Sequence, residues 1–295
     1  MKLVVGYLAT PGGADALALG IRFARTLGAE LEICIVLPPD TRAPGMPKGG
    51  YEEVLAGQAQ EWLDDALKRV PDDVVALGHV TFAESFTDGL IGLAQKHDAV
   101  AIVVGGSGGG LVGSFSLGSV VSELLHSSPL PVAVAPRGTR ESAIKKVREV
   151  TCAIGQRQGA DRLLATAVAA SKAAGTPLRL VSLVALDPAF GHLRSDDDAV
   201  RRRAHEHAQK TLDAAKAELP EGFPVTSTIV SGTSVENAVS QLDWHDGDVI
   251  MVGSSRLSAP KRIFLGNTAA KMLRVLDVPM VVVPRDDLED GEDRS

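Results

Sequence analysis

The sequence predicts an α/β protein built from two tandem domains, each a doubly wound, five-stranded, mainly parallel sheet. Three observations support this fold class. Short apolar runs alternate with segments whose apolar residues recur at helical spacing. The pattern repeats at an offset of 148 residues. A chain of 295 residues with 45% hydrophobic content is also long enough to bury two cores.

The first half opens with a strand, a helix and a second strand. Residues 2–9 ("KLVVGYLA") and 29–37 ("AELEICIVL") are nearly continuous apolar runs, as in parallel strands that are covered on both faces. Between them, residues 13–28 carry apolar side chains at helical spacing. This segment ends on Gly28, which is typical of a helix C-terminus.

The rest of the first half continues the alternation. Ser85, with Asp88 three residues later, has the capping-box spacing that predicts the start of a helix. The other expected elements are, in order, a helix at about 51–70, a strand at 74–82, a strand at 99–105, a glycine-rich loop, a helix and a final strand at 131–136.

The second half repeats the first, without a gap from Asp98 onward. Adding 148 carries "DAVAIVVGGSGGG" (98–110) onto "DGDVIMVGSSRLS" (246–258), and the match continues to the end of the last strand. In the preceding segment, "TSVE" (233–236) is the matching capping-box signal before the third helix of this half. Two homologous domains are the simplest explanation.

The domain boundaries follow from the repeat. We predict domain 1 at residues 1–137 and domain 2 at residues 147–285. The polar stretch "RGTRESAIKK" (137–146) has the turn residues and charge of a linker. The acidic tail at 286–295 is expected to be disordered.

Charge and composition limit the classes of partner that the protein can bind. The net charge of −7 argues against nucleic acid or an anionic membrane, since both attract clustered Lys and Arg. No apolar run approaches the roughly 20 residues that cross a bilayer, and the chain starts on a strand pattern instead of a signal peptide, so we expect a cytoplasmic protein. Cys34 and Cys152 lie in apolar strand patterns and are expected to be core residues, not catalytic, disulfide-forming or metal-binding ones.

The stretch "VVGGSGGGLVGSFSLGSV" (103–120) is the main functional signal. A glycine-rich turn between a strand and a helix can present several backbone N–H groups to one anion, and the helix N-terminus adds partial positive charge. The alternative is a mobile turn without a ligand. Spacing favours the first interpretation: Gly105, two residues, Gly108, nine residues, then Gly118–Ser119 resembles the G-2x-G-9x-G-[S/T] pattern of ATP-binding members of the universal stress protein family.

This resemblance covers nearly the whole chain, as two tandem domains of the universal stress protein fold, which is similar to that of the adenine nucleotide alpha hydrolases. It implies binding of ATP or another adenine nucleotide, with or without Mg²⁺. Gly105, Ser107 and Gly108 would surround the phosphates and ribose. Gly118 and Ser119 would meet the phosphates, and backbone around Val36 would contact adenine. The first strand ends on Leu8 and Ala9, where ATP-binding members commonly carry Asp, and no Lys or Arg occurs from residue 98 to 136.

The second half departs further from the pattern. Arg256 stands at the place of Gly108, and Asn267 replaces the small hydroxyl residue. A side chain at a position that needs positive φ costs roughly 1 kcal/mol and fills space meant for phosphate. We therefore expect the second domain to be degenerate for ATP and mainly structural or regulatory. Arg256, Lys261 and Arg262 would either hold an anion, face an acidic surface or be simply solvated.

Nothing in the sequence predicts an enzyme. There is no G-x-x-x-x-G-K-[S/T] loop for phosphoryl transfer. His205 and His207 are two residues apart on a predicted helix and cannot converge on one metal, so we expect no metal site there. The remaining histidines are scattered in sequence and are interpreted as surface or turn residues: His79, His97, His126, His192 and His245.

Two hypotheses remain open. The first is a stress-response regulator whose N-terminal domain binds an adenine nucleotide as a signal, with slow or no hydrolysis. The alternative is a stress scaffold that binds no nucleotide and acts through protein contacts. Because family members pair through their last strands, the resemblance also implies an intrachain pseudo-dimer through "PVAVAP" (131–136) and "PMVVVP" (279–284), with two chains forming a homodimer.

Overall fold

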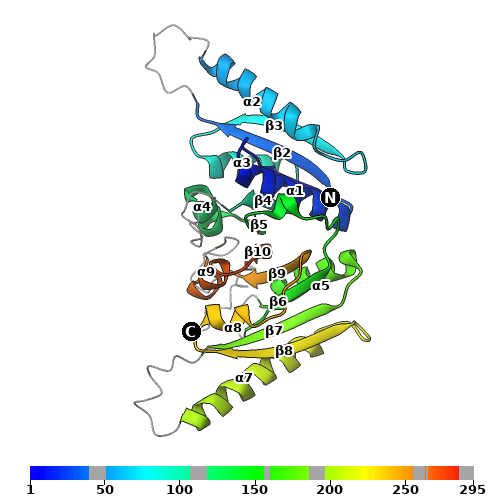
Figure 1. Ribbon diagram of the computed structural model, residues 1–295, viewed down its shortest axis with the longest axis vertical. Helices are drawn as coiled ribbons and strands as arrows, with labels where there is room; N and C mark the ends of the chain where they lie inside the picture. Colours follow the sequence, from blue (N-terminus) through cyan, green and yellow to red (C-terminus); the bar gives the residue numbers. More distant parts are fainter. Residues whose placement is uncertain are drawn as a thin grey trace, which may run out of the picture. The chain divides into compact units, whose positions relative to one another are not determined.

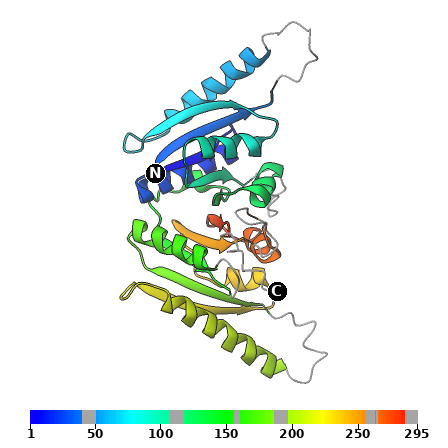
Figure 2. The ribbon, with the colours of Figure 1, turned by 180° about the vertical axis from the view of Figure 1, so that it is seen from behind.

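The computed structural model contains two compact α/β units, shown from opposite sides in Figures 1 and 2. The first comprises Met1–Leu124 with Pro131–Lys146, and the second comprises the remaining residues. The structure describes residues 1–39, 51–106, 118–155, 160–185, 197–254, 263 and 265–285. In the described helices, no segment is long and apolar enough to cross a bilayer.

The first unit follows the predicted alternation. Its elements are β1 (Lys2–Gly6), α1 (Pro11–Leu27), β2 (Glu30–Leu37), α2 (Tyr51–Leu67), β3 (Ala76–Phe82), α3 (Phe86–Lys96), β4 (Ala101–Gly105), α4 (Ser119–Ser127, which begins in this unit), β5 (Val132–Ala135) and a short 3₁₀ helix (Thr139–Glu141). The strand order is β3-β2-β1-β4-β5, and the neighbouring strands pair in parallel.

The second unit has the same topology. Its elements are β6 (Glu149–Ala153), α5 (Ala160–Ala174), β7 (Leu178–Ala185), α7 (Asp197–Ala217), β8 (Val225–Gly232), α8 (Val235–Ser240), β9 (Asp248–Gly253), α9 (Asn267–Leu273) and β10 (Met280–Val283). The order is β8-β7-β6-β9-β10, again with parallel pairs. The predicted fold class is therefore confirmed.

The core lies on both faces of each sheet, because helices cover both. In the first unit, Gly20 of α1 packs on Val5 and Leu31, while Gly89 of α3 packs on Val36. Neighbouring residues of a strand point to opposite faces, so α1 and α3 cover opposite faces of the sheet. The strands read as continuous apolar runs for this reason; in β2, Leu31 to Leu37 are all buried.

Local sequence signals located most of the predicted helix ends correctly. Gly28 ends α1 in the left-handed conformation (φ 64°), and Ser85 caps α3 by accepting a hydrogen bond from the Asp88 amide, both as predicted. The helix α1 begins two residues before the predicted start, because Thr10 is its N-cap and Pro11 its first residue.

The predicted cap of the third helix in the second half was wrong by one residue. Ser234, not Thr233, caps α8: its Oγ accepts from the Asn237 amide at 3.1 Å. The amide of Thr233 donates to Asn237 Oδ1 at 3.2 Å, so Asn237 makes the return contact expected of Glu236.

The segment predicted as a linker is tied to α1 of the first unit. Asp15, which is buried in α1, accepts hydrogen bonds from the amides of Gly138 and Arg140 and forms an ion pair with the Arg140 guanidinium at 2.9 Å. Arg22, further along α1, donates to the carbonyl of Ile144. The acidic tail at 286–295 lies outside the described residues.

Candidate functional site

The carboxyl edge of the first sheet is shaped by a close backbone approach. Gly105 is the last residue of β4, and a Cβ added to it would lie 1.9 Å from the carbonyl oxygen of Gly12 in the first turn of α1. A Cβ on Gly13 would lie 1.9 Å from the carbonyl oxygen of Leu8. The signature residue Gly105 thus has a packing reason to be glycine, independent of any ligand.

Two further predicted site residues border the same edge. Val36 lies near the end of β2, beyond Cys34, the last residue that pairs with β1. Its side chain is buried, and a Cβ on Gly89 of α3 would lie 2.5 Å from Val36 Cγ1. The Val36 side chain is therefore not available to a ligand, and contact of nearby backbone with adenine stays a prediction.

The first residues of α4 complete the described part of the site. Ser119 is its first residue, and the carbonyl of Gly118 accepts a hydrogen bond from the Ser122 amide at 3.0 Å. Ser107 and Gly108 lie outside the described residues. The structure thus places Val36 and Gly105 at carboxyl ends of the strands that flank β1, and Gly118–Ser119 at the start of the following helix. Their contact with a nucleotide stays a prediction.

The equivalent edge of the second unit contains a cavity of about 300 Å³. It lies at the carboxyl ends of β6, β7 and β9, where parallel sheets of this kind bind ligands. Its polar lining includes Ser182 on β7, His207 and Thr211 on α7, Ser254 after β9, and Thr268 on α9. Arg256, Lys261 and Arg262 lie outside the described residues, so the expected degeneracy of this domain stays a prediction.

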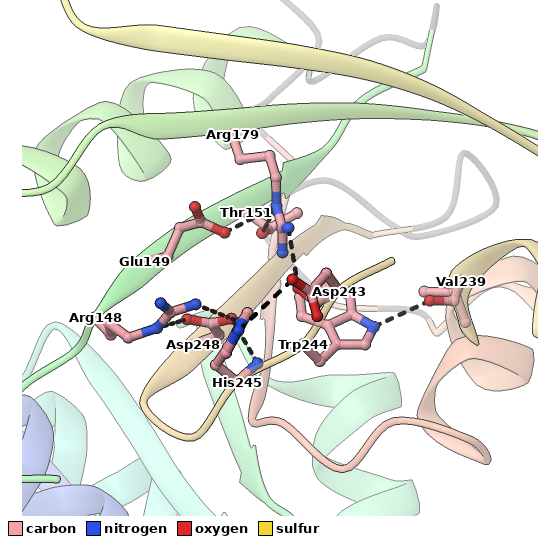
Figure 3. Close-up of polar contacts among 9 residues, drawn as sticks. All are labelled: Arg148, Glu149, Thr151, Arg179, Val239, Asp243, Trp244, His245 and Asp248. Carbon is pink, nitrogen blue, oxygen red and sulfur yellow. Dashed lines mark hydrogen bonds and ion pairs between the residues drawn. The ribbon is translucent and has the colours of Figure 1, made fainter. Parts of the chain in front are cut away.

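The amino edge of the second sheet carries a polar network (Figure 3). Arg148 holds the buried carboxylate of Asp248 through two hydrogen bonds of 2.8 and 3.1 Å, and the His245 amide donates to the same carboxylate. Arg179 donates to Thr151 Oγ1 at 2.9 Å and stacks over the Trp244 ring. These groups neutralise one another, and the network is best explained as structural.

At the amino edge of the first sheet, the interpretation as a surface or turn residue holds for His97, which lies in the turn that ends α3, but was wrong for His79, which lies in β3. The two histidines, interpreted as scattered, meet at one carboxylate. His79 Nε2 lies 2.5 Å from Glu32 Oε2, and His97 Nδ1 lies 3.2 Å from Glu32 Oε1. Lys2 Nζ lies 2.6 Å from Oε1. The sequence contained one signal for this cluster: Glu32 is a charged residue inside the apolar strand "LEICIVL".

The charges around Glu32 decide its ionisation. Burial alone would raise the pKa of Glu32, but the hydrogen bonds from Lys2 and His79 and the nearby His97 together lower it below its usual value. A carboxylate is therefore present at neutral pH, inside the sheet, with two imidazoles against it.

Comparisons with known proteins agree with this fold. The sequence profile of the universal stress protein family matches residues 1–136 and 146–284. The chain is 26% identical over 293 residues to a universal stress protein of Mycobacterium tuberculosis H37Rv, covering 96% of this chain and all of the relative.

Solved structures show the same architecture. A universal stress protein from Archaeoglobus fulgidus superposes with a TM-score of 0.68 at 19% identity, covering 96% of this chain and 98% of that one. A putative universal stress protein from Pseudomonas aeruginosa gives 0.59 at 16% identity, covering 97% and 94%. With two matched domains and relatives that share its full length, this chain belongs to the universal stress protein family, with the domain present twice in tandem.

Proposed function

We propose that this protein is a stress-response regulator that binds ATP or another adenine nucleotide at the carboxyl edge of its first domain. The observation that carries the proposal is the position of Gly105. It ends β4, next to β1, and these two strands are where the order β3-β2-β1-β4-β5 changes direction. In open α/β sheets, ligands bind at this switch point, beyond the carboxyl ends of the strands.

The chemistry available there favours binding over catalysis. Phosphates would be held by backbone N–H groups and the N-terminus of α4, because no Lys or Arg occurs from residue 98 to 136. Mg²⁺ would neutralise part of the phosphate charge. Without a cationic side chain on the transferring phosphate, hydrolysis would be slow or absent. The nucleotide then acts as a signal, and we place this regulator in the cytoplasm.

The experiment is a test of bound and added nucleotide. Mass spectrometry of the purified, denatured protein should detect adenine nucleotide, and calorimetric titration with MgATP should show saturable binding. Gly118→Val should abolish this binding because its side chain occupies the phosphate position. Gly92→Val is the matched control, because Gly92 lies on α3 with nothing within 4 Å of an added Cβ. Unchanged affinity in Gly118→Val would place the nucleotide elsewhere.

The cavity of the second unit supports a second candidate site for a small ligand. Its volume of about 300 Å³ and its hydroxyl-bearing lining suit part of a nucleotide or another polar molecule. Stoichiometry separates the possibilities. One nucleotide per chain, lost in Gly118→Val, indicates the first domain alone, whereas a residual site in that variant indicates the second. Arg256→Gly would add binding in the second domain if Arg256 alone blocks it.

The scaffold hypothesis depends on protein contacts, and the last strand of each unit is where we expect them. In each unit the last strand, β5 or β10, lies at the end of that unit's strand order, and its four residues are all buried. Such apolar edges are suited to strand pairing. We propose an intrachain pseudo-dimer and a homodimer of chains, measured by light scattering after size exclusion. If the protein binds no nucleotide at millimolar concentration, the scaffold hypothesis is the one that remains.

A further inference from the structure

Glu32, His79 and His97 form a cluster, with a buried carboxylate and two half-buried imidazoles, that the proposed nucleotide site does not use. Glu32 and His79 come from adjacent strands, β2 and β3, and His97 is the C-terminal cap of α3. Each residue offers one ligand atom, and the three atoms lie within 4.8 Å of one another. The two imidazole centroids are 4.8 Å apart. Three donors from three elements thus converge on one point.

The protein does not supply hydrogen-bond partners for every polar atom of the cluster. The Glu32 side chain is 1% exposed, which is unusual for a carboxylate. Nε2 of His97 is buried and has no hydrogen-bond partner among the described residues. Buried polar atoms normally have a partner, so the packing around the His97 ring leaves one of its two nitrogens unsatisfied. Nδ1 of this ring faces Glu32, so only a ligand that binds Nε2 after the imidazole turns over would remove the deficit.

We propose that Glu32, His79 and His97 form a binding site for one Zn²⁺ ion. Two imidazole nitrogens and one carboxylate are a donor set that Zn²⁺ accepts, with a fourth position left for water or substrate. Zinc–ligand bonds of about 2.0–2.2 Å need donors that are roughly 3.4 Å apart in a tetrahedron. The present contacts of 2.5 and 3.2 Å are slightly closer, so binding requires a small opening of the side chains.

Lys2 occupies the site in competition with the metal. Its ammonium lies 2.6 Å from Glu32 Oε1, but 31% of its side chain is exposed, so it can leave to solvent. The ammonium supplies the positive charge that Glu32 requires in the metal-free protein. Zinc would replace that charge, so metal binding competes with the Lys2 ion pair for the Glu32 carboxylate.

The second domain provides an internal contrast. Glu32 pairs with Val4 of β1, and at the corresponding register of the second sheet Arg179 pairs with Thr151 of β6. The Arg179 guanidinium is itself a cation and lies 2.9 Å from Glu149 (Figure 3). A metal ion would be repelled there. The proposal therefore predicts one zinc ion per chain.

The experiment is zinc titration of the full chain without a histidine tag. After removal of metals with chelator, calorimetry and competition with a chromophoric chelator should give one Zn²⁺ per chain. His79→Asn and His97→Asn should each weaken binding at least tenfold. Co²⁺ added in place of Zn²⁺ should give the visible absorption of a tetrahedral nitrogen–oxygen site. Absence of Zn²⁺ binding, or of an effect of both variants, would overturn the proposal.

Control variants make the result specific. His245→Asn removes a histidine that also faces carboxylates, Asp243 and Asp248, and should leave the zinc affinity unchanged. Lys2→Met should raise the affinity several-fold; no increase would refute the competing role of Lys2. Gly118→Val should keep zinc while it loses nucleotide, because the two sites lie at opposite edges of the sheet. Circular dichroism of each variant establishes that it is folded.

Discussion

Replacing Gly105 by Ala tests whether the carboxyl edge of the first sheet is built on a backbone contact. The new Cβ would lie 1.9 Å from the carbonyl oxygen of Gly12, 2.6 Å from its carbon and 3.0 Å from its Cα. All three are backbone atoms, so no side-chain rotation relieves the overlap. Gly105 does not have a positive φ, and the cost therefore comes from packing, not from backbone conformation.

The magnitude follows from the size of the overlap. Real Cβ atoms essentially never approach another heavy atom closer than 3.0 Å, so β4 and the first turn of α1 must separate by roughly 1 Å. Forced shifts of this kind cost about 2–3 kcal/mol in free energy of unfolding. For a domain of this size, the melting temperature should fall by about 6–10 °C.

The assay uses the tryptophan of each domain. The chain has two tryptophans, Trp62 on α2 and Trp244 in the second unit. In a Trp244→Phe background, urea unfolding followed by fluorescence reports on the first domain through Trp62. Gly57→Ala on α2, with nothing within 4 Å of its Cβ, is the matched control and should stabilise by about 0.5–1 kcal/mol. Equal midpoints for Gly105→Ala and the parent would refute the packing argument.

Three further outcomes follow from other parts of the structure. Arg148→Ala should cost about 2–4 kcal/mol in urea unfolding, because it leaves the carboxylate of Asp248 buried with fewer partners; a cost under about 0.5 kcal/mol would contradict this. Burial raises the pKa of the Cys152 thiol to about 12, so a thiol reagent at neutral pH should label it only after unfolding, and immediate labelling would show that it is accessible. Ser234→Ala should destabilise α8 by about 1 kcal/mol and Thr233→Ala by less than half of that, measured by thermal unfolding; equal losses would restore Thr233 as the cap.

Strong local signals made much of the fold predictable. The left-handed Gly28, the Ser85 cap and the continuous apolar strands each depend on neighbouring residues, so sequence spacing is enough to locate them. The cap of α8 shows the limit of this method. Thr233 and Ser234 are adjacent and chemically similar, and the choice depends on which hydroxyl meets the helix amides.

Of the two candidate sites in the first domain, one was predictable from the sequence and the other was not. The glycine spacing that identified the family is a property of one continuous stretch, and the sequence alone located it at the end of a strand. The sequence alone did not locate the cluster of Glu32, His79 and His97. His79 follows Glu32 by 47 residues and His97 follows His79 by 18, and the three meet only through the β2–β3 register and the end of α3.

The sequence by itself determined the fold class, the tandem organisation and the family, since these depend on periodicity and spacing along the chain. Tertiary structure decided that Gly105 touches the first turn of α1 and that two histidines contact a buried carboxylate. The physical reason is that strand register and helix placement, which bring distant residues together, are set by the packing of the whole domain.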